Sequence, residues 1–295
     1  MRVTQPIAHG VVDGPDSLTG LVVKAMSRTP DARLREVMES LVRHLHAFVR
    51  EVRPTEEEFE RGIDFLVRVG QASGPQKNEG ILLSDLLGVS TLVSLLNNSA
   101  GRGETDAALL GPFWRGNAPA CASGDCIARD AKGGEPLEVR CEVVDLGGRP
   151  LAGVDVEVWQ ASPVGLYENQ DPEQPEHNLR GRFTTDAAGR FHFRSVKPAG
   201  YPVPVDGPCG ELLRAQDRHP YRPAHIHFML SREGCRTLVT QVFDNADNAI
   251  ASDVVFGVTP ALSGRFERQG DGTWRLDYRF VMQPGERRIP KPPIP

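Results

Sequence analysis

Two histidines in the second half of the chain have the spacing of a metal-binding pair. His225 and His227 stand two residues apart within Arg222–Phe228 (RPAHIHF), where Ile226 and Phe228 favour a β-strand. Because side chains alternate between the two faces of a strand, we expect both imidazoles to point to the same side. A neutral imidazole is a common ligand of zinc, copper, iron and nickel. Such a pair alone is more often a surface or core feature, so the residues around it decide its meaning.

Two tyrosines upstream extend the set of candidate metal ligands. The chain has only four tyrosines, and two of them, Tyr167 and Tyr201, lie in strand-and-loop segments rich in glycine and proline. A phenol with an ordinary pKa of about 10 binds a metal as phenolate only when the ion is a strong Lewis acid. Ferric iron suits such anionic oxygen donors and also accepts imidazole nitrogen. Two phenolates and two imidazoles therefore predict an Fe(III) centre with room for a dianionic diol.

The first hundred residues, which must help to position this site, have helical periodicity. Between Asp31 and Val52 apolar residues recur every three or four positions, which predicts a helix that ends before Pro54. Thr55–Glu58 (TEEE) has the form of a capping box and predicts the start of a second helix. The segment from Ile81 to Leu96 is largely apolar and predicts a third helix, which we expect to be buried.

Beyond a turn-rich break at Asn97–Gly103, the sequence predicts short strands at 137–143, 154–158, 238–243 and 274–281. The turn Asp186–Gly189 predicts a hairpin between residues 183–184 and 191–193. We therefore expect a mostly β protein. An N-terminal α-helical domain, residues 1–105, would precede an antiparallel β-sandwich catalytic domain, residues 106–295. The proline-dense end, Ile289–Pro295, predicts an extended C-terminal arm.

Composition narrows the classes of function and location. With 39% hydrophobic and 25% charged residues the chain is an ordinary globular protein. A net charge of -5 and a pI near 5.9 argue against nucleic acid or an acidic membrane as a partner. The sequence contains no run of about eighteen apolar residues, so we expect no transmembrane helix. The five cysteines lack a repeated spacing, so we expect reduced thiols and a cytoplasmic location.

Several segments together resemble one enzyme family, the intradiol ring-cleavage dioxygenases. The resemblance runs from about residue 30 to 282, with the motifs in the family's order, and the helical N-terminal domain resembles the branch that acts on catechol or hydroxyquinol. The segments that carry it are Ile81–Asp85, Leu110–Phe113, Gly165–Tyr167, Gly200–Pro208, Arg222–His227 and Thr240–Gln241.

The resemblance implies one non-haem Fe(III) per chain and roles for particular residues. The metal ligands would be Tyr167, Tyr201, His225 and His227. Tyr201 would leave the metal when substrate chelates and would take a proton from the diol. Arg222 would stabilise negative charge beside the reacting carbon, and Gln241 would hydrogen-bond around the same position. The ring pocket would be lined by Leu82, Asp85, Leu109, Gly111, Pro112 and Val254. The family also implies a homodimer joined through the helical domains, often with a phospholipid at the interface.

The aromatic substrate is a further expectation, with O₂ as the second substrate. Arg43–Arg50 and Asp253–Val258 resemble hydroxyquinol 1,2-dioxygenases more than catechol 1,2-dioxygenases. Hydroxyquinol is benzene-1,2,4-triol, and its cleavage gives 3-hydroxy-cis,cis-muconate, which tautomerises to maleylacetate. Asp85 would accept a hydrogen bond from the third hydroxyl. Leu166 and Gly80 stand where the family commonly has aromatic residues, so catechol or a chlorinated or otherwise substituted catechol is an alternative substrate.

Two alternatives from other classes explain the histidines less completely. A zinc hydrolase would use nitrogen, sulfur or carboxylate donors rather than two phenolates, and no suitable glutamate motif stands near the histidines. A non-catalytic β-sandwich binding module would leave the joint occurrence of both tyrosines with Arg222 and Gln241 unexplained.

Overall fold

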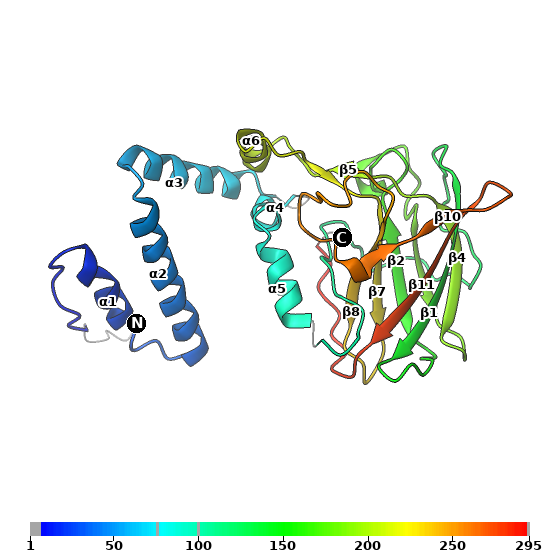
Figure 1. Cartoon of the computed structure of the whole chain (residues 1–295), viewed down its shortest axis with the longest axis horizontal. Helices are drawn as coiled ribbons and strands as arrows, with labels where there is room; N and C mark the ends of the chain where they lie inside the picture. The colour runs from blue at the N-terminus through cyan, green and yellow to red at the C-terminus, as the bar shows by residue number, and fades with distance from the viewer. Residues whose placement is uncertain (1–6, 75–76, 99–100, 294–295) are drawn as a thin grey trace. The chain divides into compact units, whose positions relative to one another are not determined.

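The computed structural model describes residues 7–74, 77–98 and 101–293, and its chain divides into two compact units, Met1–Leu66 and Val67–Pro295 (Figure 1). The division falls within a helix, α3 (Glu56–Gln71). The functional boundary predicted between residues 105 and 106 is a different division of the chain, and it stays a prediction.

The first unit contains α1 (Pro15–Ala25), α2 (Ala32–Val52) and most of α3. The predicted helix starts are confirmed. Asp31 caps α2 by accepting hydrogen bonds from the backbone of Arg33 and Leu34, and Thr55 forms the expected capping box with Glu58. The apolar stripe of α2 does not lie in a core, because no residue of the helix is buried and Phe48 is 58% exposed.

The predicted third helix is two helices, α4 (Glu79–Leu86) and α5 (Val89–Asn98), bent by 77°. Gly88 causes the break, since its φ of 70° is left-handed and ends the first helix. The expected burial is confirmed for Leu82 and Leu86 of α4 but is wrong for α5, where Leu96 is 74% exposed. Among the described residues no single helix is long and apolar enough to span a membrane, and only the bent α4–α5 pair reaches that length and composition.

Two sheets form the larger unit and pack face to face around one apolar cluster (Figure 1). The first has the order β10 (Phe266–Arg268), β11 (Trp274–Met282), β1 (Pro136–Asp145), β4 (Arg190–Val196). The second has the order β3 (Arg180–Thr184), β2 (Asp155–Gln160), β7 (His225–Ser231), β8 (Leu238–Asp244), β9 (Ser263–Gly264). A short pair, β5 (Tyr201–Pro202) and β6 (Tyr221–Arg222), stands apart. Outside the strands lie α6 (Pro208–Ala215) and the 3₁₀ turns η1 (Glu168–Gln170) and η2 (Pro260–Leu262).

The mostly β architecture is therefore confirmed, but the sheets are mixed rather than antiparallel. β1 pairs with β11 in parallel, and so does β8 with β9. The predicted hairpin at Asp186–Gly189 is also wrong, because β3 pairs with β2 while β4 pairs with β1 in the opposite sheet. The turn carries the chain from one sheet to the other. Phe183 and Phe193 consequently meet face to face across the core, with their rings 5.3 Å apart.

The chain ends and the cysteines complete the description. From Ile289 to Pro293 the predicted arm contains neither helix nor strand, and Ile294 and Pro295 lie outside the described residues. Ser99 and Ala100, in the predicted break after α5, lie outside them too. All five cysteines are free thiols.

Candidate metal centre

Strand β7 holds the two histidines of the motif on one face, as predicted from their spacing. His225 pairs in register with Phe243 of β8, and His227 lies between Trp159 of β2 and Gln241 of β8. Both imidazoles are buried, and their Nε2 atoms lie 3.2 Å apart. The His227 ring also stacks on the indole of Trp159 with centroids 4.7 Å apart. The central position of β7 in its sheet therefore fixes both rings.

The two tyrosines reach the same point from different segments. Tyr167 directly precedes η1, and Tyr201 belongs to β5, where it pairs with Arg222. The hydroxyl of Tyr201 lies 3.3 Å from the hydroxyl of Tyr167 and 3.4 Å from Nε2 of His225. All four side chains predicted as ligands are buried and present a phenol oxygen or an imidazole nitrogen to one small volume.

The protonation states suit metal ligation. Nδ1 of His225 lies 2.7 Å from the carbonyl oxygen of Pro223 and so carries the hydrogen, which leaves the Nε2 lone pair facing the cluster. Burial, reinforced by the charge of Arg222, lowers the pKa of His225 to about 3. Burial, reinforced by His225 and then Arg222, also lowers the pKa of His227 well below its ordinary value, so both imidazoles are neutral at pH 7.

The tyrosine chemistry selects the kind of ion that fits. Burial, together with the neighbouring Tyr201, raises the pKa of the Tyr167 phenol well above its ordinary value. An ion at this point must therefore be a strong enough Lewis acid to displace that proton. Within the described residues no three His, Cys, Asp or Glu side chains gather as a metal site, so a metal beside the two histidines would need the phenols as further ligands. Two phenol oxygens and two imidazole nitrogens fit Fe(III).

Two glycines allow the ligands to approach their neighbours. Gly111 has φ +74°, and a Cβ atom built on it would lie 3.2 Å from Cε1 of His227. Gly165 has φ +81°, and its Cβ would lie 3.0 Å from Cβ of Tyr201. Both positions combine a left-handed backbone with a tight contact, so a side chain would strain the backbone and press on a candidate ligand.

A buried arginine, Arg222, lies beside the histidines, and two partners hold it. Arg222 donates from Nη2 to Oε1 of Gln241 at 2.9 Å, and its Nη1 lies 3.3 Å from Nε2 of His225. Gln241 in turn donates to the carbonyl of Leu109 at 2.6 Å. The second partner, Asp253, was missed from the sequence. Its carboxylate accepts from Nε and Nη2 of Arg222, both at 3.2 Å.

The Arg222–Asp253 pair is ionised. Burial alone would lower the pKa of Arg222, but Asp253 raises it above its ordinary value. Burial alone would raise the pKa of Asp253, but Arg222 and the backbone N–H of Gly257 hold it below its ordinary value. A fixed positive charge therefore lies next to the candidate ligands.

The residues predicted to line a ring pocket fall into two groups. Leu82 of α4, Val254 and the partly buried Leu109 belong to one apolar cluster. Asp85, also on α4, is half-buried, and it interacts electrostatically with Arg222 and Asp253. Burial raises its pKa above the ordinary value, although Ser90 and Arg222 act in the opposite direction. Pro112 follows Gly111 and is exposed, outside this cluster.

A second buried ion pair, which the sequence analysis did not identify, lies next to Tyr167. Arg180 of β3 donates Nε to both carboxylate oxygens of Glu168, at 2.8 and 2.7 Å. Its guanidinium lies 5.9 Å from the centre of the Tyr167 ring, and Phe113 packs on the same ring at 4.6 Å. Neither Arg180 nor Glu168 belongs to a recognisable motif, so only the adjacency of Glu168 to Tyr167 could have drawn attention to the pair.

Comparisons with known proteins agree with this arrangement. The family profile described as Dioxygenase matches residues 109–284, and the profile described as Catechol dioxygenase N terminus matches residues 31–105. A 6-chlorohydroxyquinol 1,2-dioxygenase of Cupriavidus pinatubonensis is 47% identical over 91% of this chain and 97% of its own length. A hydroxyquinol 1,2-dioxygenase of a Rhizobium species is 44% identical over 88% of this chain and 92% of its own.

Solved structures lead to the same family. The crystal structure of a hydroxyquinol 1,2-dioxygenase from Pseudomonas putida superposes with a TM-score of 0.87 at 39% identity, covering 92% of this chain and 99% of that one. A non-catalytic binding module is thereby excluded, since these relatives are enzymes. The chain belongs to the intradiol ring-cleavage dioxygenases, in the hydroxyquinol and catechol 1,2-dioxygenase branch.

Proposed function

We propose that the protein is an Fe(III)-dependent hydroxyquinol 1,2-dioxygenase. It would cleave the ring of benzene-1,2,4-triol between the two carbons that bear adjacent hydroxyl groups. Both atoms of O₂ would enter the product, 3-hydroxy-cis,cis-muconate. The observation that carries the proposal is the convergence of Tyr167, Tyr201, His225 and His227 beside Arg222. The names of the relatives at 47% and 44% identity support the triol as substrate.

The four convergent side chains would hold the iron, in the roles expected from the sequence. Ferric iron bound there supplies the Lewis acidity that draws two adjacent hydroxyl groups of a diol into the site and activates the ring toward O₂. Tyr201 would act as the proton acceptor. Its hydroxyl lies within 3.4 Å of both Tyr167 and His225, so as a phenolate it can receive a proton from a substrate hydroxyl at the same point.

Arg222 and Gln241 would stabilise the charge that develops on the substrate. The guanidinium is held in the ionised form by Asp253, and it approaches the cluster next to His225. Negative charge that develops near the hydroxyl-bearing carbons would therefore meet a fixed cation in a buried environment. Gln241 orients the guanidinium by accepting from Nη2 while its own amide group is anchored to the Leu109 carbonyl.

Asp85 would select the triol. It is the half-buried carboxylate of α4, and the charge of Arg222 acts on it electrostatically. A carboxylate at that position can accept a hydrogen bond from the third hydroxyl of hydroxyquinol, whereas catechol has no group to offer it.

Oxygen uptake by iron-loaded protein tests the function. Hydroxyquinol and catechol are supplied in parallel, autoxidation is subtracted, and maleylacetate or muconate is identified. We expect faster turnover of hydroxyquinol and a red protein, because tyrosinate-to-Fe(III) charge transfer absorbs visible light. Tyr201→Phe should lose activity and change the colour, whereas Tyr221→Phe should change neither, because Tyr221 is 52% exposed. A colourless iron-loaded protein that consumes no O₂ with either substrate would contradict the proposal.

A chlorinated triol is the second candidate substrate. The relative at 47% identity is named for 6-chlorohydroxyquinol. Leu166 and Gly80, the positions without the family's common aromatic residues, would leave space for a larger ring substituent. Adding 6-chlorohydroxyquinol to the same assay separates the two candidates by their ratio of kcat/KM.

We also propose that two copies of the chain associate through the helical region. The stripe on α2 is apolar and uncovered in the single chain, and it consists of Leu34, Val37, Leu41, Leu45 and Phe48. A second copy would remove this surface from water, with a phospholipid filling the remaining apolar space. Light scattering of the purified protein measures the oligomeric state, and mass spectrometry of an organic extract detects the lipid. The five free thiols accord with the cytoplasm as the proposed location.

A further inference from the structure

Arg218, which no motif singles out, connects two walls of the candidate ring pocket. It follows α6, and its guanidinium donates from Nη1 to the carbonyl of Leu86 and from Nη2 to the carbonyl of Val254, both at 2.9 Å. The Leu86 carbonyl is at the C-terminal end of α4, where backbone carbonyls lack helical partners and the helix dipole favours a cation. One planar side chain thus satisfies two carbonyls on separate segments.

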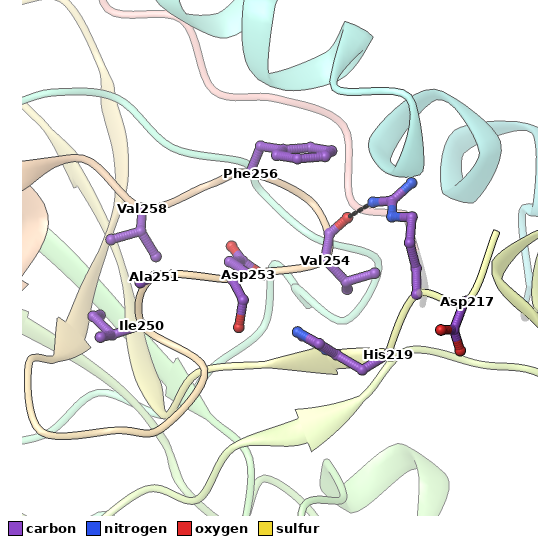
Figure 2. Close-up of a pocket in the computed structure, with 10 residues that line it drawn as sticks. Asp217, His219, Ile250, Ala251, Asp253, Val254, Phe256 and Val258 are labelled. Carbon is purple, nitrogen blue, oxygen red and sulfur yellow. Dashed lines mark hydrogen bonds between the residues drawn. The ribbon is translucent and has the colours of Figure 1, made fainter.

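The segment that carries Val254, residues 250–258, borders a pocket that Arg218 also lines. A pocket of about 450 Å³ lies there, and Figure 2 shows Ile250, Val254, Phe256 and Val258 along it, opposite His219. The hydroxyl of Thr91 on α5 donates to the next carbonyl, that of Val255, at 2.9 Å and is a second anchor.

Phe256 gives the same segment a strained conformation that the arginine stabilises. Its φ of 59° is left-handed, which is costly for a bulky residue. The guanidinium of Arg218 lies 5.1 Å from the centre of its ring. The ring also lies near Gly88, where an added Cβ would lie 3.4 Å from Cδ2 of Phe256. The cation, the ring and the end of α4 therefore form one continuous contact.

Both tethered segments bear groups that the proposed reaction uses. α4 carries Leu82 and Asp85, and the 250–258 segment carries Val254 and Asp253, which holds Arg222. We propose that Arg218 is a positioning residue that sets the separation of these two walls and thereby the fit of the aromatic ring. The inference rests on the proposed function, because it assumes that a diol occupies the space they enclose.

The chemistry of the side chain makes the inference specific to arginine. A guanidinium presents several N–H donors in a rigid plane and can bond two carbonyls at once while its face covers an aromatic ring. A lysine ammonium at the same position keeps the charge but has no such plane. Lysine should therefore restore the cation at the end of α4 without restoring the spacing between the walls.

Arg218→Met and Arg218→Lys, prepared as iron-loaded protein, test this role against Arg149→Met as a control. Arg149 is also hydrogen-bonded, but it is 85% exposed and pairs with Asp145 in a distant turn. The measurements are kcat and KM for hydroxyquinol and catechol, and the Kd of hydroxyquinol from anaerobic calorimetry. We expect the Kd and KM for hydroxyquinol to rise by about tenfold in Arg218→Met, with iron content retained and kcat lowered less than threefold. A tenfold change corresponds to about 1.4 kcal/mol. The Arg218→Lys protein should be more stable than the Arg218→Met protein, but it should recover less than half of the affinity for hydroxyquinol that Arg218→Met loses.

The outcomes separate the inference from the proposed function. Wild-type protein that neither binds nor cleaves a diol would overturn the proposed function and this role with it. Wild-type activity together with unchanged Kd, KM and substrate ratio in both variants would overturn the role of Arg218 alone, as would full rescue by lysine. If Arg218→Met does not fold, Arg218→Lys decides. A wild-type Kd in the folded lysine variant contradicts the inference, and a raised Kd supports it.

Discussion

Replacing Asp253 by asparagine should slow the proposed reaction by about thirtyfold while hydroxyquinol binds almost normally. Oδ1 of Asp253 accepts from Nε of Arg222, and Oδ2 accepts from Nη2 of Arg222 and from the backbone N–H of Gly257. Asparagine has one carbonyl oxygen and one NH₂ group. In either orientation one donor of Arg222 would face another donor, so the guanidinium would lose one of its two contacts.

The magnitude follows from the burial of the pair. Removing one partner of a buried ion pair costs about 3–5 kcal/mol. Asparagine keeps one of the two contacts at 3.2 Å, so we assign about half of that cost, roughly 1.5–2.5 kcal/mol, to the misplaced guanidinium. Because the guanidinium acts mainly on the transition state in the proposed reaction, this loss lowers kcat by about 13- to 70-fold.

The assay is steady-state oxygen uptake with hydroxyquinol, together with iron content and thermal unfolding of each protein. Asp277→Asn is the matched control, because the Asp277 side chain is 60% exposed where it pairs with Arg275 at 2.9 Å, and ion pairs in contact with solvent contribute about 0–1 kcal/mol. A folded, iron-replete D253N protein whose kcat stays within threefold of the wild type would refute the positioning of Arg222 by Asp253. A change confined to KM would refute it as well.

Three further changes test other parts of the site. Asp85→Ala should lower the preference for hydroxyquinol over catechol in kcat/KM by about tenfold or more, since a hydrogen bond to a charged group contributes about 1.5–3 kcal/mol. Gly111→Ala should release iron and lower the melting temperature, because its Cβ meets His227 at 3.2 Å. Acid should destabilise the wild type more than D253N. The pKa of Asp253 is lowered in the folded state, so its contribution is complete above the ordinary carboxyl pKa of about 4 and is lost as the pH falls through the folded value.

Each of these expectations has a control and an opposing result. For Asp85 the reasoning fails if the substrate preference is unchanged in the alanine variant. Gly234→Ala is the control for Gly111, since its φ of +79° brings the same backbone strain with no atom within 4 Å of the added Cβ, and equal iron loss in both variants would exclude the contact as the cause. If the melting temperatures of wild type and D253N fall by the same amount between about pH 5 and pH 3, the assigned pKa direction is contradicted.

The local pattern of residues predicted the shared face of the two histidines, because side chains alternate along a strand, whereas the roles assigned to the site residues stay predictions. His225 and His227 share a face of β7, and the two tyrosines reach them from strand-and-loop segments, Tyr167 just before η1 and Tyr201 within β5. Asp253 and Arg218 could not be found in this way. Each acts through contacts with residues distant in the sequence. In the sequence alone, a single aspartate or arginine cannot be told from an ordinary charged residue at the surface.

Strand pairing and helix burial were predicted less well, for two physical reasons. Alternation tells which face of a strand is buried but not which strand is its neighbour, so the segments around Asp186–Gly189 suited a hairpin and equally a change of sheet. Apolar content tells that a surface avoids water but not what covers it. The exposed Leu96 of α5 and Phe48 of α2 are apolar without belonging to the core of this chain.

The parallel pairing of β1 with β11 has a consequence for synthesis of the chain. Residues 137–145 bond to residues 274–282, so one edge of β1 has no partner until residues 274–282 have left the ribosome. Until then β1 is hydrogen-bonded to β4 along one edge only. Its other, unpaired edge can pair with strands of other nascent chains. Chains truncated before Trp274 should therefore accumulate as insoluble protein, although the four residues of the candidate metal centre would all be present in them.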